Sequence, residues 1–158
     1  MMMLQLTPLQ GMPLISPGDD LANLIIDRLT KANSGIQDGD IIVVAQKIIS
    51  KSEGCLVNIS TIKPSPRALE LGEITGKDPR LLELILKESN QVLRVRKGLI
   101  IVEHRLGFVC ANAGIDHSNV RGDWGDPDDW VLLLPKDPDT SAAKIRKRVY
   151  KITGKSIG

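Results

Sequence analysis

The amino-acid sequence predicts an α+β fold, with a mixed or antiparallel β-sheet and helices packed against it. Three short apolar runs, at residues 92–95, 99–102 and 107–111, follow one another with turn residues between them, which predicts an antiparallel meander. The predicted helices lie before and after this meander instead of alternating with single strands. With 158 residues, the chain has the length of one domain and can bury about 70% of its unfolded surface.

The N-terminal part of the chain predicts two strands and a helix between them. Residues 4–9 predict a short strand. Ser16 is predicted to cap the helix, with Pro17 in its first turn. Residues 41–45 form a continuous apolar run, mostly β-branched, and predict a strand buried on both faces. The core-facing stripe of the helix is expected to be Leu21, Leu24, Ile25 and Leu29.

Later segments carry a repeated start signal for helices. Ser65, Asp78 and Asp137 each precede a proline, which suits an N-cap followed by the first helical residue. The first of these helices is expected to end near Gly76, and the last is expected to run to about Ile152. The remaining predicted elements are strands at residues 55–59 and 130–134 and an aspartate-rich loop at residues 122–129.

Composition excludes several classes of protein. Lys and Arg number 21 against 19 Asp and Glu, a balance that does not suit a dedicated nucleic-acid or membrane-surface protein. Only 3% of residues are aromatic, which argues against stacking platforms for single-stranded nucleic acid. No apolar run approaches the roughly 20 residues of a membrane span, and the N-terminus lacks a signal-peptide pattern. We therefore expect a cytoplasmic protein that binds neither nucleic acid nor membrane.

Several residues that suggest chemistry are interpreted as structural. Residues 154–156 (GKS) resemble the end of a phosphate-binding P-loop, but Val149 stands where that motif needs a glycine, so a helix end is favoured. His104 is interpreted as a surface residue of a hairpin, and the basic residues 144–155 as a solvated helix face. The two cysteines show no metal or redox spacing, and Cys110 is interpreted as a buried thiol.

For each of two groups of residues, the sequence leaves a functional and a structural interpretation open. Lys47 and Lys51 would share one face of a helix, where two ammonium groups could hold a triphosphate, or they could be two solvated lysines. Asp116, three positions before Asn119, could bind Mg²⁺ beside a nucleotide, or both could belong to an Asx-type turn. Taken as isolated residues, both groups favour the second interpretation.

Several segments together resemble the coenzyme F420-0:L-glutamate ligase family, the gamma-glutamyl ligases. The resemblance runs through the chain in order, and it is specific as a set although no single motif decides it. The segments that carry it are residues 11–15 (GMPLI), 17–21 (PGDDL), 38–44 (DGDIIVV), 46–54 (QKIISKSEG), 64–68 (PSPRA), 75–80 (TGKDPR), 107–116 (GFVCANAGID), 134–135 (LP), 137–139 (DPD) and 141–142 (SA).

The resemblance implies a GTP-dependent amide ligase of coenzyme F420 biosynthesis, with F420-0 and L-glutamate as substrates. In such a reaction GTP converts a carboxylate into an acyl phosphate, and the glutamate amine then displaces phosphate. A site of this kind must position the reactants and neutralise phosphate charge. The resemblance therefore also implies a divalent metal, Mg²⁺ or Mn²⁺, with K⁺ as an optional further ion, and an intertwined homodimer.

The resemblance also implies roles for individual residues. Asp116 would be a metal ligand, and Lys51 a lysine on the phosphate side of the nucleotide. Some family members carry Ser-Thr at the positions of Gln46 and Lys47. The residues implied to contact GTP are Met12, Pro13, Leu14, Ile15, Gln46, Lys47, Lys51 and Asn119.

The chief departure from the family pattern is length. Members of the family continue beyond the position of Gly158, where a further strand leads to an Asp-Thr pair of the metal site. We therefore expect residues 1–158 to be an N-terminal portion of the ligase domain. Three hypotheses follow: an F420-0 gamma-glutamyl ligase, a non-catalytic nucleotide-binding or dimerising fragment that includes the case of a split ligase, and a GTP-dependent ligase for another carboxylate.

Overall fold

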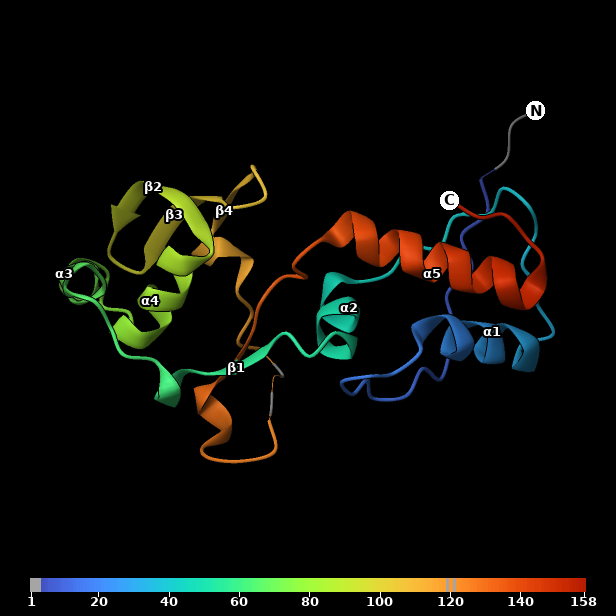
Figure 1. Cartoon of the computed structure of the whole chain (residues 1–158), viewed down its shortest axis with the longest axis horizontal. Helices are drawn as coiled ribbons and strands as arrows, with labels where there is room; N and C mark the ends of the chain where they lie inside the picture. The colour runs from blue at the N-terminus through green and yellow to red at the C-terminus, as the bar shows by residue number, and fades with distance from the viewer. Residues whose placement is uncertain (1–3, 119, 121) are drawn as a thin grey trace. The chain divides into compact units, whose positions relative to one another are not determined.

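The computed structural model describes residues 4–118, 120 and 122–158 (Figure 1). The chain forms two compact units, and each is described by itself. The first unit contains the residues up to Gly54 together with Pro135–Gly158, and the second contains Cys55–Leu134. The five α-helices and two small antiparallel sheets of the described residues confirm the α+β class.

Three helices make up the first unit: α1 (Leu21–Lys31), α2 (Gln46–Ser52) and α5 (Pro138–Thr153). Helix α5 begins as predicted, because the Asp137 carboxylate accepts the backbone N–H of Thr140 at 2.9 Å. Helices α1 and α5 pack on a small apolar core, since Ala22 of α1 and Val149 of α5 are both buried in one cluster with Ile157.

The predicted cap of α1 is wrong. Asp20, not Ser16, caps the helix by accepting the backbone N–H of Asn23 at 3.1 Å. Ser16 instead begins a turn that Asp19 closes, with the Ser16 N–H donating to the Asp19 carboxylate at 2.7 Å. Gly18 has a φ of +90° within this turn, a backbone conformation that favours glycine. The predicted core stripe is confirmed in part, with Leu21 and Ile25 buried.

The two strands predicted in this unit are also wrong. Residues 4–9 and 41–45 form no strand among the described residues. The side chains of Leu4 and Leu6 are 84% and 81% exposed, and those of Ile41 and Val43 are 76% and 89% exposed. A strand buried on both faces needs covering neighbours, and these exposed fractions show that the described residues leave Ile41 and Val43 largely uncovered.

The second unit contains both sheets. A two-stranded antiparallel sheet pairs β1 (Leu56–Asn58) with β5 (Trp130–Leu132). The predicted meander is confirmed as an antiparallel sheet in the order β2, β3, β4. Its strands are β2 (Ser89–Arg96), β3 (Leu99–His104) and β4 (Val109–Ala111).

Two helices accompany these sheets, and both begin where the sequence predicts. Ser65 caps α3 (Pro66–Thr75), Asp78 caps α4 (Pro79–Lys87), and proline occupies the first turn of each. Gly76 ends α3 with a φ of 71°. Three short 3₁₀ turns complete the unit: η1 (Ile59–Thr61), η2 (Asn112–Gly114) and η3 (Pro127–Asp129).

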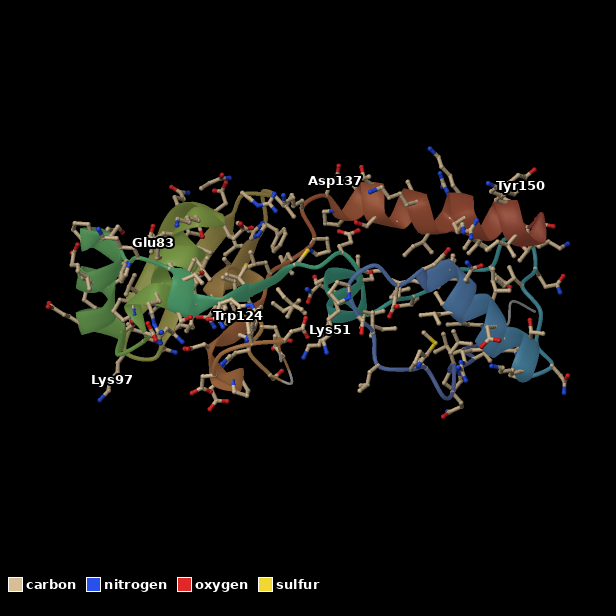
Figure 2. All side chains as sticks on the ribbon, turned by 60° about the horizontal axis from the view of Figure 1, so that its bottom comes forward. Lys51, Glu83, Lys97, Trp124, Asp137 and Tyr150 are labelled. Carbon is tan, nitrogen blue, oxygen red and sulfur yellow. The ribbon has the colours of Figure 1, made fainter. Side chains whose placement is uncertain are left out.

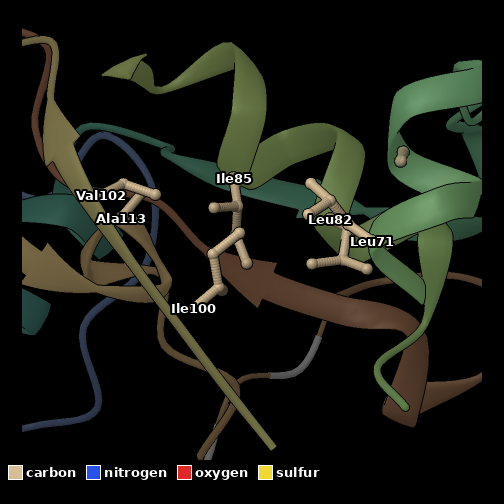
Figure 3. Close-up of a cluster of buried hydrophobic side chains, with 7 residues drawn as sticks. Leu71, Leu82, Ile85, Ile100, Val102 and Ala113 are labelled. Atoms are coloured by element: carbon tan, nitrogen blue, oxygen red, sulfur yellow. The ribbon is translucent and has the colours of Figure 1, made fainter. Parts of the chain in front are cut away.

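The core of the second unit lies between the two helices and the three-stranded sheet (Figure 3). Strand β3 alternates in burial, which is the period of two that a half-buried strand requires. The residues of this cluster come from α3, α4, β3 and η2, and all are at most 1% exposed: Ala68, Leu71, Leu82, Ile85, Ile100, Val102 and Ala113.

His104 is the third inward residue of β3, so its interpretation as a surface residue is wrong. Its side chain is fully buried and stacks on Phe108, with the ring centroids 4.9 Å apart. Nδ1 accepts the backbone N–H of Leu106 at 3.0 Å, and Nε2 lies 3.7 Å from Oε2 of Glu88. Burial lowers the pKa of His104, and the nearby positive charge of Arg105 lowers it further. The negative charge of Glu88 acts in the opposite direction but does not cancel these effects.

Two structural interpretations of basic residues are confirmed, that of residues 144–155 as a solvated helix face only in part, because Arg148 and Lys155 form ion pairs with Asp20 and Asp38. Lys144, Lys147 and Lys151 are exposed along α5, as expected of a solvated face. Gly154 ends α5 with a φ of 71°, so residues 154–156 begin as a helix cap and form no P-loop. No helix in the described part of the chain has the length and apolar character needed to cross a membrane.

Candidate functional site

Helix α2 carries the lysine pair predicted to bind phosphate. Residues 46–52 are helical, so Lys47 and Lys51 share one helix face, as the spacing predicts. Both lysine side chains are half-buried. Gln46 begins the helix, and its side-chain amide donates to the hydroxyl of the fully buried Ser50 at 2.6 Å. The position of Gln46 is therefore set by a contact inside α2.

The loop implied to contact GTP is joined to the end of α2. The backbone N–H of Gly18 donates to the carbonyl of Ser52 at 2.8 Å, one residue after Lys51. Within the loop, Ile15 is buried whereas Leu14 is 93% exposed. The structure therefore joins Gly18, three residues after this loop, to the end of the lysine helix in the first unit.

Helix α5 reaches the same end of α2 through its first turn. Ser141 Oγ donates to the carboxylate of Glu53, and Ser141 itself is buried. Sequence analysis assigned neither residue a role at the site. Their hydrogen bond connects positions 88 residues apart, and no local pattern would reveal it.

Asp116 lies in the second unit, where a β-bridge fixes its backbone. Its N–H donates to the carbonyl of Leu132 at 3.0 Å, and the N–H of Leu132 donates back to the carbonyl of Asp116 at 2.8 Å. The preceding turn is left-handed, with φ of 52° at Asn112 and Ala113 and 67° at Gly114. A Cβ on Gly114 would lie 2.9 Å from Cδ1 of Leu134, so glycine also provides the space that this turn needs.

The Asp116 carboxylate accepts two hydrogen bonds from Ser118. The backbone N–H and the hydroxyl of Ser118 both donate to Oδ1 at 2.8 Å. This is the Asx-type turn that the sequence left open for Asp116. Ser118 is a neighbour of the carboxylate that sequence analysis did not single out. Asn119, the predicted nucleotide contact, lies outside the described residues.

Asp116 can supply one carboxylate ligand to a metal ion. Mg²⁺ is commonly held by one or two carboxylates together with phosphate oxygens and water. The described residues contain no group of three or more His, Cys, Asp or Glu side chains that could hold a metal ion. Asp116 therefore fits as one ligand beside nucleotide phosphates, and residues 4–118, 120 and 122–158 do not supply a full ligand set.

The loop after Asp116 gathers both tryptophans of the chain (Figure 2 labels Trp124). Their rings meet edge to face, with centroids 5.2 Å apart, and Trp130 Nε1 donates to the carbonyl of Trp124 at 2.8 Å. His117 Nε2 lies 2.6 Å from the carbonyl of Asp128. The two tryptophans therefore stabilise the loop that follows Asp116.

The chain is similar in sequence to a known family of ligases. A sequence model of the F420-0:Gamma-glutamyl ligase family matches residues 11–158. The coenzyme F420:L-glutamate ligase of Methanothermobacter thermautotrophicus is 48% identical over 154 residues, which covers 98% of this chain and 59% of that protein.

Two further relatives carry the same name. That of Methanopyrus kandleri is 43% identical over 91% of this chain and 53% of its own length, and that of Archaeoglobus fulgidus is 40% identical over 99% and 58%. The chain thus spans between 53% and 59% of the length of these three relatives. The family match and the identity over nearly the whole chain establish that this protein belongs to the F420-0:gamma-glutamyl ligase family.

Proposed function

We propose that this chain is part of a GTP-dependent ligase that joins L-glutamate to the coenzyme F420 precursor F420-0. The observation that carries the proposal is the 48% identity to a coenzyme F420:L-glutamate ligase over 98% of the chain. Ligase chemistry of this kind needs an energy source, because a free carboxylate is a poor electrophile. GTP supplies that energy by phosphorylating the carboxylate.

The first unit would hold the nucleotide. Lys47 and Lys51 place two ammonium groups on one face of α2, an arrangement that can neutralise a triphosphate. The loop from Met12 to Ile15 and the amide of Gln46 would contact the nucleotide beside them. The Gly18–Ser52 hydrogen bond supports this assignment, because it joins a residue that follows the loop closely in sequence to the end of the lysine helix.

Asp116 would be a ligand of Mg²⁺ or Mn²⁺, and Asn119 would be a nucleotide contact. When bound, such an ion neutralises charge on the phosphate oxygens during phosphoryl transfer. Ser118 would hold the Asp116 carboxylate in a fixed orientation through its two donors to Oδ1. We assign K⁺ no ligand among the residues of this chain.

The reaction would proceed in two balanced steps. In the first, a carboxylate oxygen of F420-0 attacks the γ-phosphorus of GTP, and GDP leaves with the electrons of the broken bond. In the second, the glutamate amine attacks the acyl carbon, phosphate leaves, and the amine loses a proton. The lysines would act in the first step by neutralising charge, which is the main contribution of proteins to phosphoryl transfer.

A homodimer forms part of this proposal, and a split ligase is the second candidate. An adjacent reading frame that begins with a β-run and an Asp-Thr pair would favour the split ligase. In that case the 158-residue chain would bind GTP only weakly and would not ligate glutamate alone. A second polypeptide would complete the site.

A ligation assay tests the proposal directly. The chain would be joined to the part of the Methanothermobacter relative outside the match, and supplied with GTP, Mn²⁺ or Mg²⁺, F420-0 and glutamate. We expect GDP release that depends on both glutamate and F420-0, with a product heavier by glutamate residues. GDP release that depends on neither glutamate nor F420-0 would contradict the proposal. Ligation of glutamate to a carboxylate other than that of F420-0 would indicate a different substrate.

A further inference from the structure

Helix α2, which carries Lys47 and Lys51, has little apolar contact to hold it in the first unit. It is seven residues long, and a helix of this length is marginal without tertiary contacts. Of its seven residues, all of them described, only Ser50 is buried. The apolar clusters within the described part of the chain contain no residue of α2. The position of its lysines therefore depends on polar contacts at the ends of the helix.

Two such contacts follow Lys51 directly. The carbonyl of Ser52 accepts the backbone N–H of Gly18 at 2.8 Å. The carboxylate of Glu53 accepts the hydroxyl of Ser141 at 2.5 Å, within the range of a charge-assisted bond between a hydroxyl and a carboxylate. The end of α2 that carries Lys51 is thus joined to two segments that lie elsewhere in the sequence.

Ser141 is a donor held in a fixed place. Its side chain is buried, and its backbone N–H donates to the carbonyl of Asp137 at 3.0 Å, which sets it in the first turn of α5. Helix α5 extends along the first unit from the end of α2 to α1 (Figure 1), where Val149 lies in one apolar cluster with Ala22. Ser141 therefore connects the end of α2 to the core of the first unit.

Neither partner of the Ser141–Glu53 hydrogen bond needs the other to satisfy its polar atoms. The Ser141 hydroxyl also lies 3.0 Å from the carbonyl of Asp137, which could accept it inside α5. Glu53 is exposed, so water can solvate its carboxylate. What the bond adds is a defined position for the end of α2.

We propose that Ser141 and Glu53 are positioning residues of the nucleotide site, which act on GTP through Lys51. A lysine binds phosphate as a point charge on a flexible stem, so its contribution depends on where its backbone is held. The Ser141–Glu53 bond holds that backbone two residues after Lys51. The inference rests on the proposed function, in which the lysines of α2 bind the triphosphate, and it adds two residues that do not touch the nucleotide.

A double-mutant cycle in the complete ligase tests the proposal, with GTP affinity measured by calorimetry. Ser141→Ala should weaken GTP binding about fivefold or more, and Lys51→Gln should weaken it about tenfold. In the Ser141→Ala background, Lys51→Gln should cost less than about threefold, because the lysine is no longer held in place. A purely structural role of Ser141 predicts instead that the two losses multiply.

Variants of Glu53 examine the same bond from the other side. Glu53→Ala should match Ser141→Ala, and the two changes together should be no worse than either alone, because they remove one bond. Glu53→Gln keeps an acceptor oxygen and should bind GTP within about twofold of the wild type. Because Glu53 is exposed, Glu53→Ala carries the test if Ser141→Ala does not fold.

Arg148→Gln is the matched control. It breaks a different long-range contact of α5, in which Arg148 Nε donates to the carboxylate of Asp20 at 2.9 Å, and it should leave GTP affinity unchanged. A loss in Arg148→Gln equal to that in Ser141→Ala would overturn the proposal, because it would assign the effect to a general loosening of α5.

Three further results would overturn the positioning role. They are wild-type GTP affinity in Ser141→Ala and Glu53→Ala, the full loss from Lys51→Gln in the Ser141→Ala background, and no loss from Lys51→Gln in the wild type. A complete ligase that does not bind GTP at all is a different result, and it would contradict the proposed function itself.

Discussion

Gly122 lies directly against the indole of Trp130, so closely that a Cβ on Gly122 would fall 2.0 Å from Cε2 of the ring. The Trp130 ring is mostly buried, belongs to a cluster with Leu132 and Val120, and donates its N–H to Trp124. It therefore cannot move away without giving up both contacts. This pair holds the loop that follows Asp116 onto strand β5.

Gly122→Ala should destabilise the second unit by about 1–3 kcal/mol, the usual cost of overpacking a well-packed site. Urea unfolding followed by tryptophan fluorescence measures the change. Gly35→Ala is the matched control, because the nearest atom to its Cβ would be 3.9 Å away, and it should change stability little. A stability of Gly122→Ala equal to that of the control would contradict the packing described for Trp130.

His104 should make the stability of the protein depend on pH. Its folded pKa is lowered, chiefly by burial, so below the ordinary histidine value the unfolded chain binds a proton that the folded chain does not. Stability should therefore fall as the pH drops below about 6.5, and the loss should level off once the folded pKa is passed. Urea midpoints at neutral and mildly acidic pH measure this.

His104→Leu should remove that pH dependence. It should also cost about 1–3 kcal/mol at neutral pH, because the Leu106 N–H loses its acceptor. His117→Gln, at the exposed second histidine, should leave the dependence in place. An unchanged pH profile in His104→Leu would show that other groups cause it.

The lysine pair of α2 should govern nucleotide affinity in the complete ligase. Lys47→Gln and Lys51→Gln should each weaken GTP binding about tenfold, which corresponds to roughly 1.4 kcal/mol for one lost charge-assisted contact. Calorimetry at two salt concentrations should show a weaker salt dependence in both variants. Lys144→Gln, on the exposed face of α5, is the control, and an equal loss there would indicate a non-specific charge effect.

Asp116 and Ser118 should act together in metal binding. In the complete ligase, Asp116→Asn should weaken Mn²⁺ binding in the presence of GTP by more than tenfold, as measured by electron paramagnetic resonance. Ser118→Ala should weaken it about 10-fold to 100-fold, the usual range for residues that orient a ligand. Asp126→Asn in the same loop should bind Mn²⁺ normally. Normal binding by Asp116→Asn would exclude Asp116 as a ligand.

Local signals account for the parts of the fold that the sequence predicted correctly. Ser65, Asp78 and Asp137 cap helices through hydrogen bonds to residues two or three positions away, so a short window of sequence contains the whole interaction. The meander was predicted for the same reason, because its strands follow one another with short turns. The helical spacing of Lys47 and Lys51 was likewise visible.

The wrong strand prediction at residues 41–45 concerns a segment whose burial is decided by residues far away in sequence. The run at residues 41–45 has the composition of a buried strand, but burial depends on partners that the described residues do not provide. His104 is different, because its signal was present. It continues the inward series of Ile100 and Val102 at a period of two, and its charge-bearing neighbours Glu103 and Arg105 obscured that series.

In the candidate site, too, the local features were predictable from the sequence and the long-range contacts were not. The Asx-type turn at Asp116 is local and was one of the two interpretations available from the sequence. The contacts of Ser141 with Glu53 and of Gly18 with Ser52 connect distant segments, and only the structure reveals them. The roles of Met12 to Ile15 in GTP binding came from family resemblance alone and stay predictions.

In the proposed reaction, GTP activates a carboxylate of the coenzyme precursor before glutamate attacks it. Following ¹⁸O from a labelled carboxylate of F420-0 during ligation by the complete enzyme tests this order of steps. Acyl-phosphate formation transfers one carboxylate oxygen to the phosphate that leaves, so the inorganic phosphate should carry one ¹⁸O for each amide formed. Phosphate free of ¹⁸O, with amide formation intact, would exclude an acyl phosphate of F420-0 as the intermediate.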